Sequence, residues 1–252
     1  HLSIDDALRH AEQMVADGAD IIDIGGESTR PGSGRVSVDD EVERVIPVIR
    51  ALRNRFDIPI SVDTTKAEVA HAAIDAGAEI INDISGLRWD AGIAAVAAKA
   101  NAGLVLMHSL GTFETMHSQQ PVDNIFTEVT KSLAESVATA KEWGVTDDHI
   151  ALDVGIGFGK TAEQNLELLA NLDRLVTEFE NYPMVVGASR KSFIGKILGD
   201  APPNDRLGGS LAAALVAVER GAKILRVHDV KQTVAALRIL SAVDNAGKKD
   251  ER

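Results

Sequence analysis

Three segments share one pattern, a Gly-Ala pair followed by a charged residue, two apolar residues and a polar one: Gly18-Ala19-Asp20-Ile21-Ile22-Asp23, Gly77-Ala78-Glu79-Ile80-Ile81-Asn82 and Gly221-Ala222-Lys223-Ile224-Leu225-Arg226. Each glycine fits the end of a helix, where a left-handed backbone is common. The apolar residues after it fit a short strand that ends on a polar side chain. The pattern therefore predicts helices that lead directly into strands.

Short apolar segments closed by polar residues recur along the chain and indicate seven strands. They lie at residues 20–28, 60–64, 79–85, 104–109, 150–158, 184–189 and 224–229. Stretches with helical periodicity lie between them, at residues 38–55, 67–76 and 125–143. Strands that alternate with helices indicate a parallel sheet joined by helical crossovers.

Polar residues alternate with apolar ones in these strands, so the two sets are expected to face opposite ways. The apolar set, which can face the helices, comprises Ile22, Ile24, Val62, Leu152, Leu225 and Val227. The polar set comprises Asp23, Asp63, Asn82, Asp153, Arg226 and His228. A flat doubly wound sheet has almost uniformly apolar strands, whereas a closed barrel holds polar residues at its carboxyl rim. The sequence therefore predicts one α/β domain over residues 1–252, a (β/α)8 TIM barrel whose first strand precedes His1.

The charge and the cysteine content of the chain limit the kinds of partner and of metal site that are expected. Thirty-eight acidic residues against 26 basic ones give a net charge of -12, which disfavours binding to nucleic acid and to anionic membranes. The chain has no cysteine, which excludes disulfides and thiolate metal sites. Neither a signal peptide nor an apolar run of membrane-spanning length is present, so a soluble cytoplasmic protein is expected.

Carboxylate and amide groups close three of the predicted strands. Asp63, Asn82 and Asp153 could bond the ring nitrogens and exocyclic amine of a heterocycle. Structural strand-end residues are about as common, and Thr64 and Asp83 suit helix capping better. The loop at residues 27–32 places a hydroxyl and a guanidinium after a strand, although an ordinary turn explains it equally well.

Two basic segments and one glycine-rich loop follow later strands. Residues 155–161 resemble a phosphate-binding loop, but Val154 stands where the first glycine is required, so a loop that covers a substrate is favoured. Residues 189–195 lead into a helix and suit an anion, with Lys191 adding charge. Arg226 and His228 could hold a pyrophosphate. The commoner alternatives are an ion pair for the arginine and a histidine whose ring is simply hydrogen-bonded within the protein. Zinc-protease and nucleophile-elbow motifs are absent.

Seven motifs in fixed order resemble dihydropteroate synthases. They are Asp-Ile-Gly-Gly-Glu-Ser-Thr-Arg-Pro-Gly from Asp23, Ser-Val-Asp-Thr from Ser61, Ile-Asn-Asp-Ile from Ile81, Leu-Met-His from Leu106, Gly-Ile-Gly-Phe-Gly-Lys-Thr from Gly155, Ser-Arg-Lys-Ser-Phe-Ile-Gly from Ser189 and Arg-Val-His-Asp from Arg226. Each motif alone is weak or moderate, but their joint order over nearly the whole chain is specific.

The resemblance implies a dimeric barrel that condenses 6-hydroxymethyl-7,8-dihydropterin pyrophosphate with p-aminobenzoate, with Mg²⁺ as cofactor. It assigns the pterin to Asp63, Asn82, Met107, Asp153, Gly187, Lys191 and Arg226. It assigns p-aminobenzoate, and the sulfonamides that imitate it, to Thr29, Arg30, Pro31, Phe158, Lys191 and Ser192. It assigns pyrophosphate to Arg30, Arg226 and His228. The resemblance also implies that Asp63, Asp153, Lys191 and Arg226 are the catalytic residues.

Physical chemistry is consistent with this assignment. Breaking the C–O bond creates a pterin cation, which Asp63 and Asp153 would stabilise, and a pyrophosphate anion, which the basic residues and Mg²⁺ would stabilise. The aniline nitrogen then attacks, so no enzyme nucleophile is required.

The chain departs from the family pattern at three points. The first loop of the family, with an asparagine that helps bind Mg²⁺, would precede His1, while Ser109 and Val154 replace a common Met and a common Pro. A corrinoid-dependent, pterin-binding methyltransferase domain and a catalytically silent paralogue are the competing hypotheses. The methyltransferase would not need Thr-Arg-Pro, Ser-Arg-Lys-Ser or Arg-Val-His.

Overall fold

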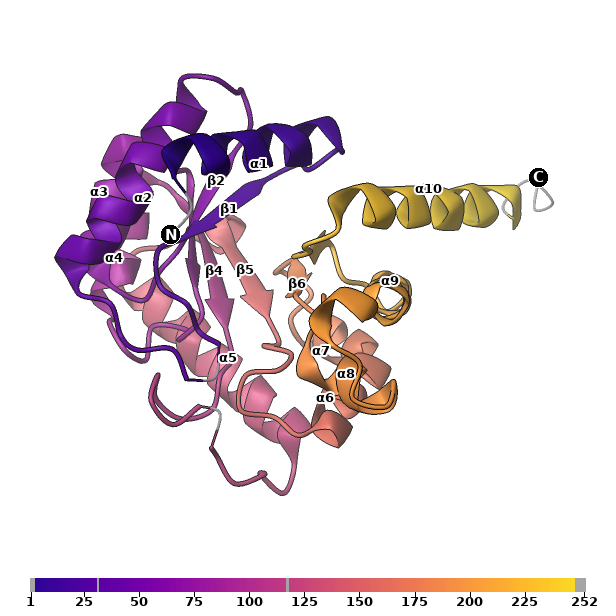
Figure 1. Cartoon of the computed structure of the whole chain (residues 1–252). Coiled ribbons are helices and arrows are strands. Elements are labelled where there is room, and N and C mark those ends of the chain that lie inside the picture. The colour runs from indigo at the N-terminus through magenta and orange to yellow at the C-terminus, as the bar shows by residue number, and fades with distance from the viewer. Residues whose placement is uncertain (1–2, 31, 117, 248–252) are drawn as a thin grey trace.

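The computed structural model describes residues 3–30, 32–116 and 118–247, and its strands alternate with helices along the whole of that length (Figure 1). The strands are β1 (Ile22–Gly25), β2 (Ile60–Asp63), β3 (Ile80–Asp83), β4 (Gly103–Met107), β5 (Ile150–Asp153), β6 (Met184–Val186) and β7 (Ile224–Leu225). The helices are α1 (Ile4–Ala16), α2 (Val38–Arg53), α3 (Ala67–Ala76), α4 (Gly92–Ala100), α5 (Ile125–Glu142), α6 (Ala162–Ala170), α7 (Leu172–Glu178), α8 (Ser192–Ile197), α9 (Leu207–Glu219) and α10 (Val230–Gly247). Two short 3-10 helices, η1 (Asp147–His149) and η2 (Pro203–Asp205), precede β5 and α9.

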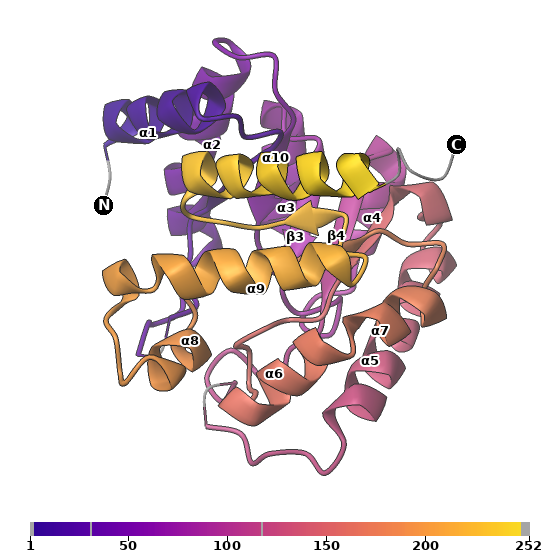
Figure 2. The ribbon, with the colours of Figure 1, turned by 90° about the vertical axis from the view of Figure 1, so that its right-hand side faces the viewer.

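The seven strands form one sheet in chain order, and every neighbouring pair is parallel. The sheet curls as a half-barrel with the helices outside it, and α9 and α10 flank β7 (Figure 2). Within the described residues β7 and β1 have no pairing with each other. The predicted barrel fold, with seven of its strands in this chain, is confirmed.

The repeated glycine pattern has the predicted conformation. Gly77 ends α3 in the left-handed region with φ of 111°, and Gly18 and Gly221 both have φ of 99° after α1 and α9. Residues with a Cβ are disfavoured at positive φ, so glycine lets the chain turn at the end of each helix and enter the strand three or four residues later.

Apolar strand residues form the core under the helices. Ile60, Val62, Ile81, Leu104 and Leu152 are each at most 1% exposed, and their alternate neighbours carry the polar set. Hydrogen-bonded caps begin some of the outer helices. Ser3 at the start of α1 and Thr161 at the start of α6 each form a capping box with the residue three positions later. No helix in the described part of the chain is long and apolar enough to cross a membrane.

Several predicted boundaries and caps were wrong in detail. The strands are shorter than predicted, and β7 ends at Leu225, so Arg226 and His228 lie in the loop after it. Thr64 accepts a hydrogen bond from the backbone N–H of Lys66 at 3.3 Å, and α3 has no side-chain cap. Asp83 bonds the turn at Ser85 and Leu87 instead of capping α4. These short polar side chains accept hydrogen bonds from backbone N–H groups of the turn after each strand. That turn lies closer along the chain than the first turn of the next helix.

Candidate functional site

The carboxyl ends of the strands bring together side chains that lie far apart in the sequence. In a parallel sheet these ends share one edge, so the last residue of each strand has neighbours from the strands beside it. The residues at or directly after these ends are Asp63, Asp83, Met107, Asp153, Gly187 and Arg226, with Asn82 one position earlier in β3.

Arg226 connects the two ends of the sheet. Its Nε donates to Asp23 Oδ2 at 2.6 Å and its Nη2 donates to Asp63 Oδ2 at 2.8 Å. Asn82 Nδ2 donates to the same oxygen of Asp23 at 3.3 Å. One guanidinium therefore joins the loop after β7 to β1 and β2, since its planar fork can bond two carboxylates at once.

Asp23 is a residue that the candidate set from the sequence left out. The sequence pattern did place it among the inward-facing polar residues, and that position was the available signal. Its second carboxylate oxygen, Oδ1, is buried and has no hydrogen-bond partner among the described residues.

Asp153 and Lys191 form the opposite side of the site. Asp153 is 5% exposed, and its Oδ1 accepts a hydrogen bond from the Gly155 backbone N–H at 2.7 Å. Burial raises the pKa of Asp153, while that hydrogen bond and Lys191 oppose the rise. Burial lowers the pKa of Lys191 to about 8, against the attraction of Asp153. The Lys191 ammonium lies 4.0 Å from the ring centre of Phe158.

A small cavity of about 20 Å³ lies among these groups. Six of the seven residues assigned to the pterin line it, and Asp63 adjoins it through Arg226. The lining comprises Asn82, Ile84, Met107, Asp153, Ile156, Phe158, Gly187, Lys191 and Arg226. We call this space the pterin cavity. Its volume is about what one water molecule needs, so a heterocycle has to displace the Lys191 and Arg226 side chains.

A second cavity of about 400 Å³ lies beside the loop between β1 and α2. Its lining comprises Thr29, Arg30, Gly32, Ser33, Gly34, Arg35, Phe113, Glu114 and Ser118. We call this space the loop cavity. The residues assigned to p-aminobenzoate thus divide between two places.

The loop cavity holds Thr29 and Arg30, whereas Phe158 and Lys191 line the pterin cavity. Ser192 begins α8 with an exposed side chain and lines neither cavity. Pro31 lies outside the described residues.

The glycine-rich loop after β5 is held together by a lysine that the sequence candidates did not include. Lys160 Nζ donates to the carbonyl oxygens of Gly155 at 2.7 Å, Phe158 at 3.2 Å and His108 at 3.3 Å. Burial lowers the pKa of Lys160 to about 7. Lys160 thus bonds two carbonyls of its own loop, which agrees with the rejection of a triphosphate-binding loop.

Gly155→Ala should unfold at clearly lower urea concentration than the native protein. Gly155 has φ of 68°, and an added Cβ would lie 1.8 Å from the carbonyl oxygen of His108. Strain and displacement of this kind typically cost roughly 1–3 kcal/mol or more. Gly34→Ala is the control, because a Cβ there meets nothing within 4 Å. Equal urea midpoints for the two variants would contradict this view of the loop.

The segment after β6 carries two adjacent basic residues, Arg190 and Lys191, and they point in different directions. Arg190 forms a two-point ion pair with Asp229, through Nε to Oδ2 at 2.9 Å and through Nη2 to Oδ1. Only Lys191 of the two basic residues therefore faces the pterin cavity. Arg190 has φ of 58°, and this backbone turn directs its side chain away from Lys191.

His228 is held by Ser189, whose Oγ lies 3.1 Å from His228 Nδ1 and accepts from its backbone N–H at 3.2 Å. Burial, with help from Arg190 and Arg226, lowers the pKa of His228. At neutral pH this side chain is therefore a neutral hydrogen-bonding group and not a cation. Among the residues that the structure describes, no three His, Asp or Glu side chains are placed to hold a metal ion.

Comparison with known proteins gives the family of this chain. A family model described as pterin binding enzyme matches residues 1–228. A dihydropteroate synthase of Escherichia coli (strain K12) is 45% identical over 254 residues, which cover 100% of this chain and 88% of that protein.

Two solved structures have the same fold and considerable sequence identity. Dihydropteroate synthase of Burkholderia cenocepacia, complexed with 7,8-dihydropteroate, has a TM-score of 0.90 at 44% identity, covering 98% of this chain and 89% of that chain. The enzyme of Xanthomonas albilineans, with 4-aminobenzoic acid, has a TM-score of 0.90 at 41% identity, covering 97% and 86%. This chain therefore belongs to the dihydropteroate synthase family of pterin-binding enzymes.

Proposed function

We propose that the pterin cavity binds the pterin and that the loop after β1 brings p-aminobenzoate to it. The reaction of the family is a transfer, EC 2.5.1.15, which joins 6-hydroxymethyl-7,8-dihydropterin pyrophosphate to p-aminobenzoate and releases pyrophosphate. The observation that carries the assignment is the lining of one cavity by residues from β3, β4, β5 and the loops after β5, β6 and β7.

The pterin would be held through its polar edge. Asp153 offers a buried carboxylate to neighbouring N–H groups, and Asn82 offers both a donor and an acceptor. Met107 contributes an apolar surface against the ring, and Gly187 adds no side chain where the ring must pass. Asp63 becomes available to the pterin when Arg226 moves from its carboxylate.

Charged residues of both signs would then act on the reacting centre. The C–O bond of the pterin substrate breaks and its electron pair leaves with pyrophosphate, so positive charge develops on the pterin carbon. Asp63 and Asp153 stabilise that charge, while Arg30 and Arg226 stabilise the leaving group. His228, neutral at pH 7, supplies a hydrogen bond to the leaving group.

p-Aminobenzoate would bind between the two cavities, with its amine toward the pterin. Phe158 supplies an aromatic face, and Lys191 with Ser192 at the start of α8 supplies the partners for the carboxylate. Thr29, Arg30 and Pro31 would complete this site from the side of the loop cavity. A sulfonamide would occupy the same place. The aniline nitrogen attacks the pterin carbon and then loses its proton, so no covalent enzyme intermediate forms.

Mg²⁺ is the cofactor that the resemblance implies. Among the described residues no three His, Asp or Glu side chains lie together as its ligands, so the ion would be held largely by the pyrophosphate of the substrate and by water.

The pH dependence should report the two charged groups of the pterin cavity. Burial raises the pKa of Asp63 to about 7, although Arg226 opposes the rise. Asp63 carries the negative charge that stabilises the pterin cation only above that pH, and Lys191 keeps its charge only below its own pKa of about 8. We therefore expect kcat/KM to rise through about pH 7 and fall above about pH 8.

Asp63→Asn tests the acidic limb, because an amide does not ionise. The variant should be less active and should lose the rise near pH 7 while keeping the fall at higher pH. An acidic limb that persists unchanged in Asp63→Asn would assign it to another group.

We propose that the chain forms a homodimer through α9 and α10. Ile239 and Val243 lie four residues apart on α10, hence on one side of it, and are 68% and 64% exposed. Val216 on α9 is 39% exposed. Light scattering after gel filtration should give a dimer for the native chain and a monomer for Ile239→Lys. Leu166→Lys, which changes an exposed leucine on α6, should remain a dimer; a dimeric Ile239→Lys would place the contact elsewhere.

The function is tested by mixing the purified chain with both substrates and Mg²⁺. Formation of dihydropteroate and pyrophosphate in equal amounts is expected. Absence of both products, from protein that still binds pterin, would instead favour a silent pterin-binding paralogue. We propose further that residues 1–252 form a single domain.

A further inference from the structure

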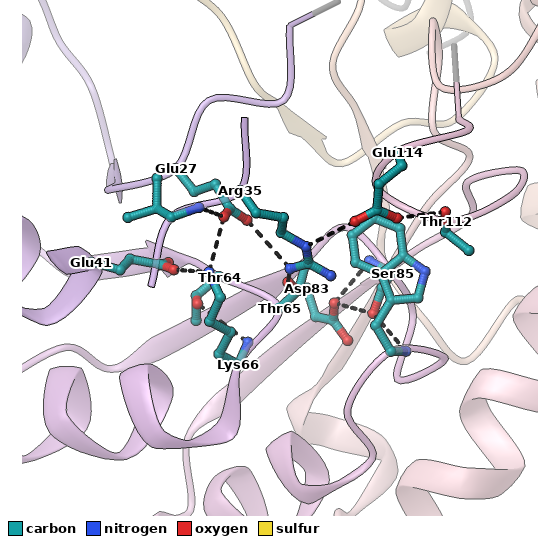
Figure 3. Close-up of polar contacts among 12 residues, drawn as sticks. Glu27, Arg35, Glu41, Thr64, Thr65, Lys66, Asp83, Ser85, Thr112 and Glu114 are labelled. Carbon is teal, nitrogen blue, oxygen red and sulfur yellow. Dashed lines mark hydrogen bonds and ion pairs between the residues drawn. The ribbon is translucent and has the colours of Figure 1, made fainter. Parts of the chain in front are cut away.

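The loop that connects β1 to α2 is closed at its base by one buried carboxylate. Glu27 Oε1 accepts a hydrogen bond from the Val36 backbone N–H at 2.6 Å and from Lys66 Nζ at 3.0 Å. Lys66 also pairs with Glu41, and the two glutamate side chains are only 7% and 1% exposed (Figure 3). The two ends of this loop, at Glu27 and Val36, therefore lie next to each other.

Arg35 extends from the end of this loop to the loops after two other strands. Its guanidinium carbon lies 4.8 Å from the ring centre of Phe113 and 5.2 Å from that of Trp89. Its Nε lies 3.6 Å from Glu114 Oε1, and its Nη1 lies 3.6 Å from Glu27 Oε2 (Figure 3). Trp89 follows β3, whereas Phe113 and Glu114 follow β4, so one side chain joins the loops of three strands.

The aromatic contact is the stronger part of this junction. The Glu114 side chain is 63% exposed, so water and salt screen its pairing with Arg35. Trp89 and Phe113 meet edge to face, with ring centres 6.2 Å apart. A guanidinium against aromatic rings keeps much of its attraction at a partly exposed site.

The rings that Arg35 contacts belong to an apolar cluster, or pack against it, and that cluster shares residues with the pterin cavity. Phe113 belongs to a compact apolar cluster that is separate from the main core. The cluster comprises Ile84, Met107, Phe113, Met116 and Phe158, with Trp89 packed against it. Ile84, Met107 and Phe158 also line the pterin cavity. Arg35 thus packs against the same apolar cluster that contributes three residues to the pterin cavity.

We propose that Arg35 is a positioning residue for p-aminobenzoate. By docking the end of the loop between β1 and α2 on Trp89 and Phe113, it holds Thr29 and Arg30 in the loop cavity, which Phe113 also lines. The role of the docked loop rests on the proposed function, whereas the docking itself does not. Because Arg35 would act through Thr29 and Arg30, its loss should weaken p-aminobenzoate binding and leave pterin binding nearly unchanged.

The docking can be tested without turnover, through tryptophan fluorescence. The chain has two tryptophans, so Trp143→Phe leaves Trp89 as the only one. In that background Arg35→Ala should shift the Trp89 emission to longer wavelength, because its ring loses its cover. Unchanged emission would overturn the proposal, whether or not the chain makes dihydropteroate.

Arg55→Ala in the same background is the matched control. Arg55 also lies near an aromatic ring, at 5.8 Å from Phe56, and pairs with Glu12 at 3.4 Å. It follows α2 and precedes β2, at the amino end of the strands. Its loss should leave the Trp89 emission and both KM values unchanged.

Steady-state kinetics test the functional part. Arg35→Ala should raise KM for p-aminobenzoate about 3–10-fold and change KM for the pterin substrate by less than about twofold. Arg35→Lys, which keeps the charge, should restore part of the loss. Equal increases in both KM values, or no increase in either, would overturn the role in p-aminobenzoate binding. If the native chain makes no dihydropteroate, the proposed function fails, while the emission experiment still decides the docking.

Discussion

Arg226→Ala is expected to lower kcat/KM for the condensation on the order of 10³-fold, the scale of removing a preorganised charge partner from a transition state. The variant loses the proposed partner of the leaving pyrophosphate. It also leaves Asp23 and Asp63 facing each other without the cation between them. Steady-state assay of both substrates measures the loss.

Arg226→Lys and Arg220→Ala are the two controls for Arg226→Ala. A lysine carries the charge but cannot bond Asp23 and Asp63 at once through a planar fork, so activity should be recovered only in part. Arg220 pairs with Asp173 at 3.2 Å on the surface, and its removal should change little. Near-normal turnover by Arg226→Ala would reject the role assigned to this residue.

Asp153→Asn is expected to reduce condensation by a similar order, about 10³-fold, because it removes both a charge-assisted hydrogen bond and the negative charge that stabilises the pterin cation. The substitution keeps the size of the side chain and an oxygen for the Gly155 N–H. The fold should therefore survive. Calorimetric titration with the pterin measures the binding part of the loss, and the condensation assay measures the remainder.

Asp147→Asn is the matched control for Asp153→Asn. Asp147 pairs with Lys141 at 2.8 Å on the surface and accepts a hydrogen bond from Tyr182 at 2.6 Å. Its amide variant should bind the pterin normally. If Asp153→Asn also binds it normally, the pterin does not contact this carboxylate.

Much of the fold could be predicted from the sequence because the pattern is local. The Gly-Ala template marks where a helix ends and a strand begins, and the polar residue that closes it marks the carboxyl end. Parallel strands place such ends on one edge, so Asp63, Asn82 and Asp153 were predicted to meet. The structure brings Asn82 and Asp153 to one cavity and places Asp63 beside it.

Side-chain direction beyond the strand ends could not be predicted in the same way. Arg190 and Lys191 are adjacent and both basic, yet the positive φ of Arg190 directs it to Asp229. Lys160 looked like part of a phosphate loop, but its ammonium bonds carbonyl oxygens of that loop. Such outcomes depend on loop backbone and on distant partners, which residue spacing does not encode.

The sequence also could not predict that the residues assigned to p-aminobenzoate divide between two cavities. Thr29 and Arg30 line the loop cavity and Lys191 lines the pterin cavity. Arg35, at the end of the same loop, contacts the rings after β3 and β4, and that contact joins segments more than fifty residues apart.

A crystal structure of the chain with 6-hydroxymethyl-7,8-dihydropterin tests the central claim most directly. The pterin should lie between Asn82, Asp153 and Met107, with Lys191 and Arg226 moved from their present positions to admit it. A pterin bound elsewhere, with these five side chains still enclosing the same small space, would contradict the account.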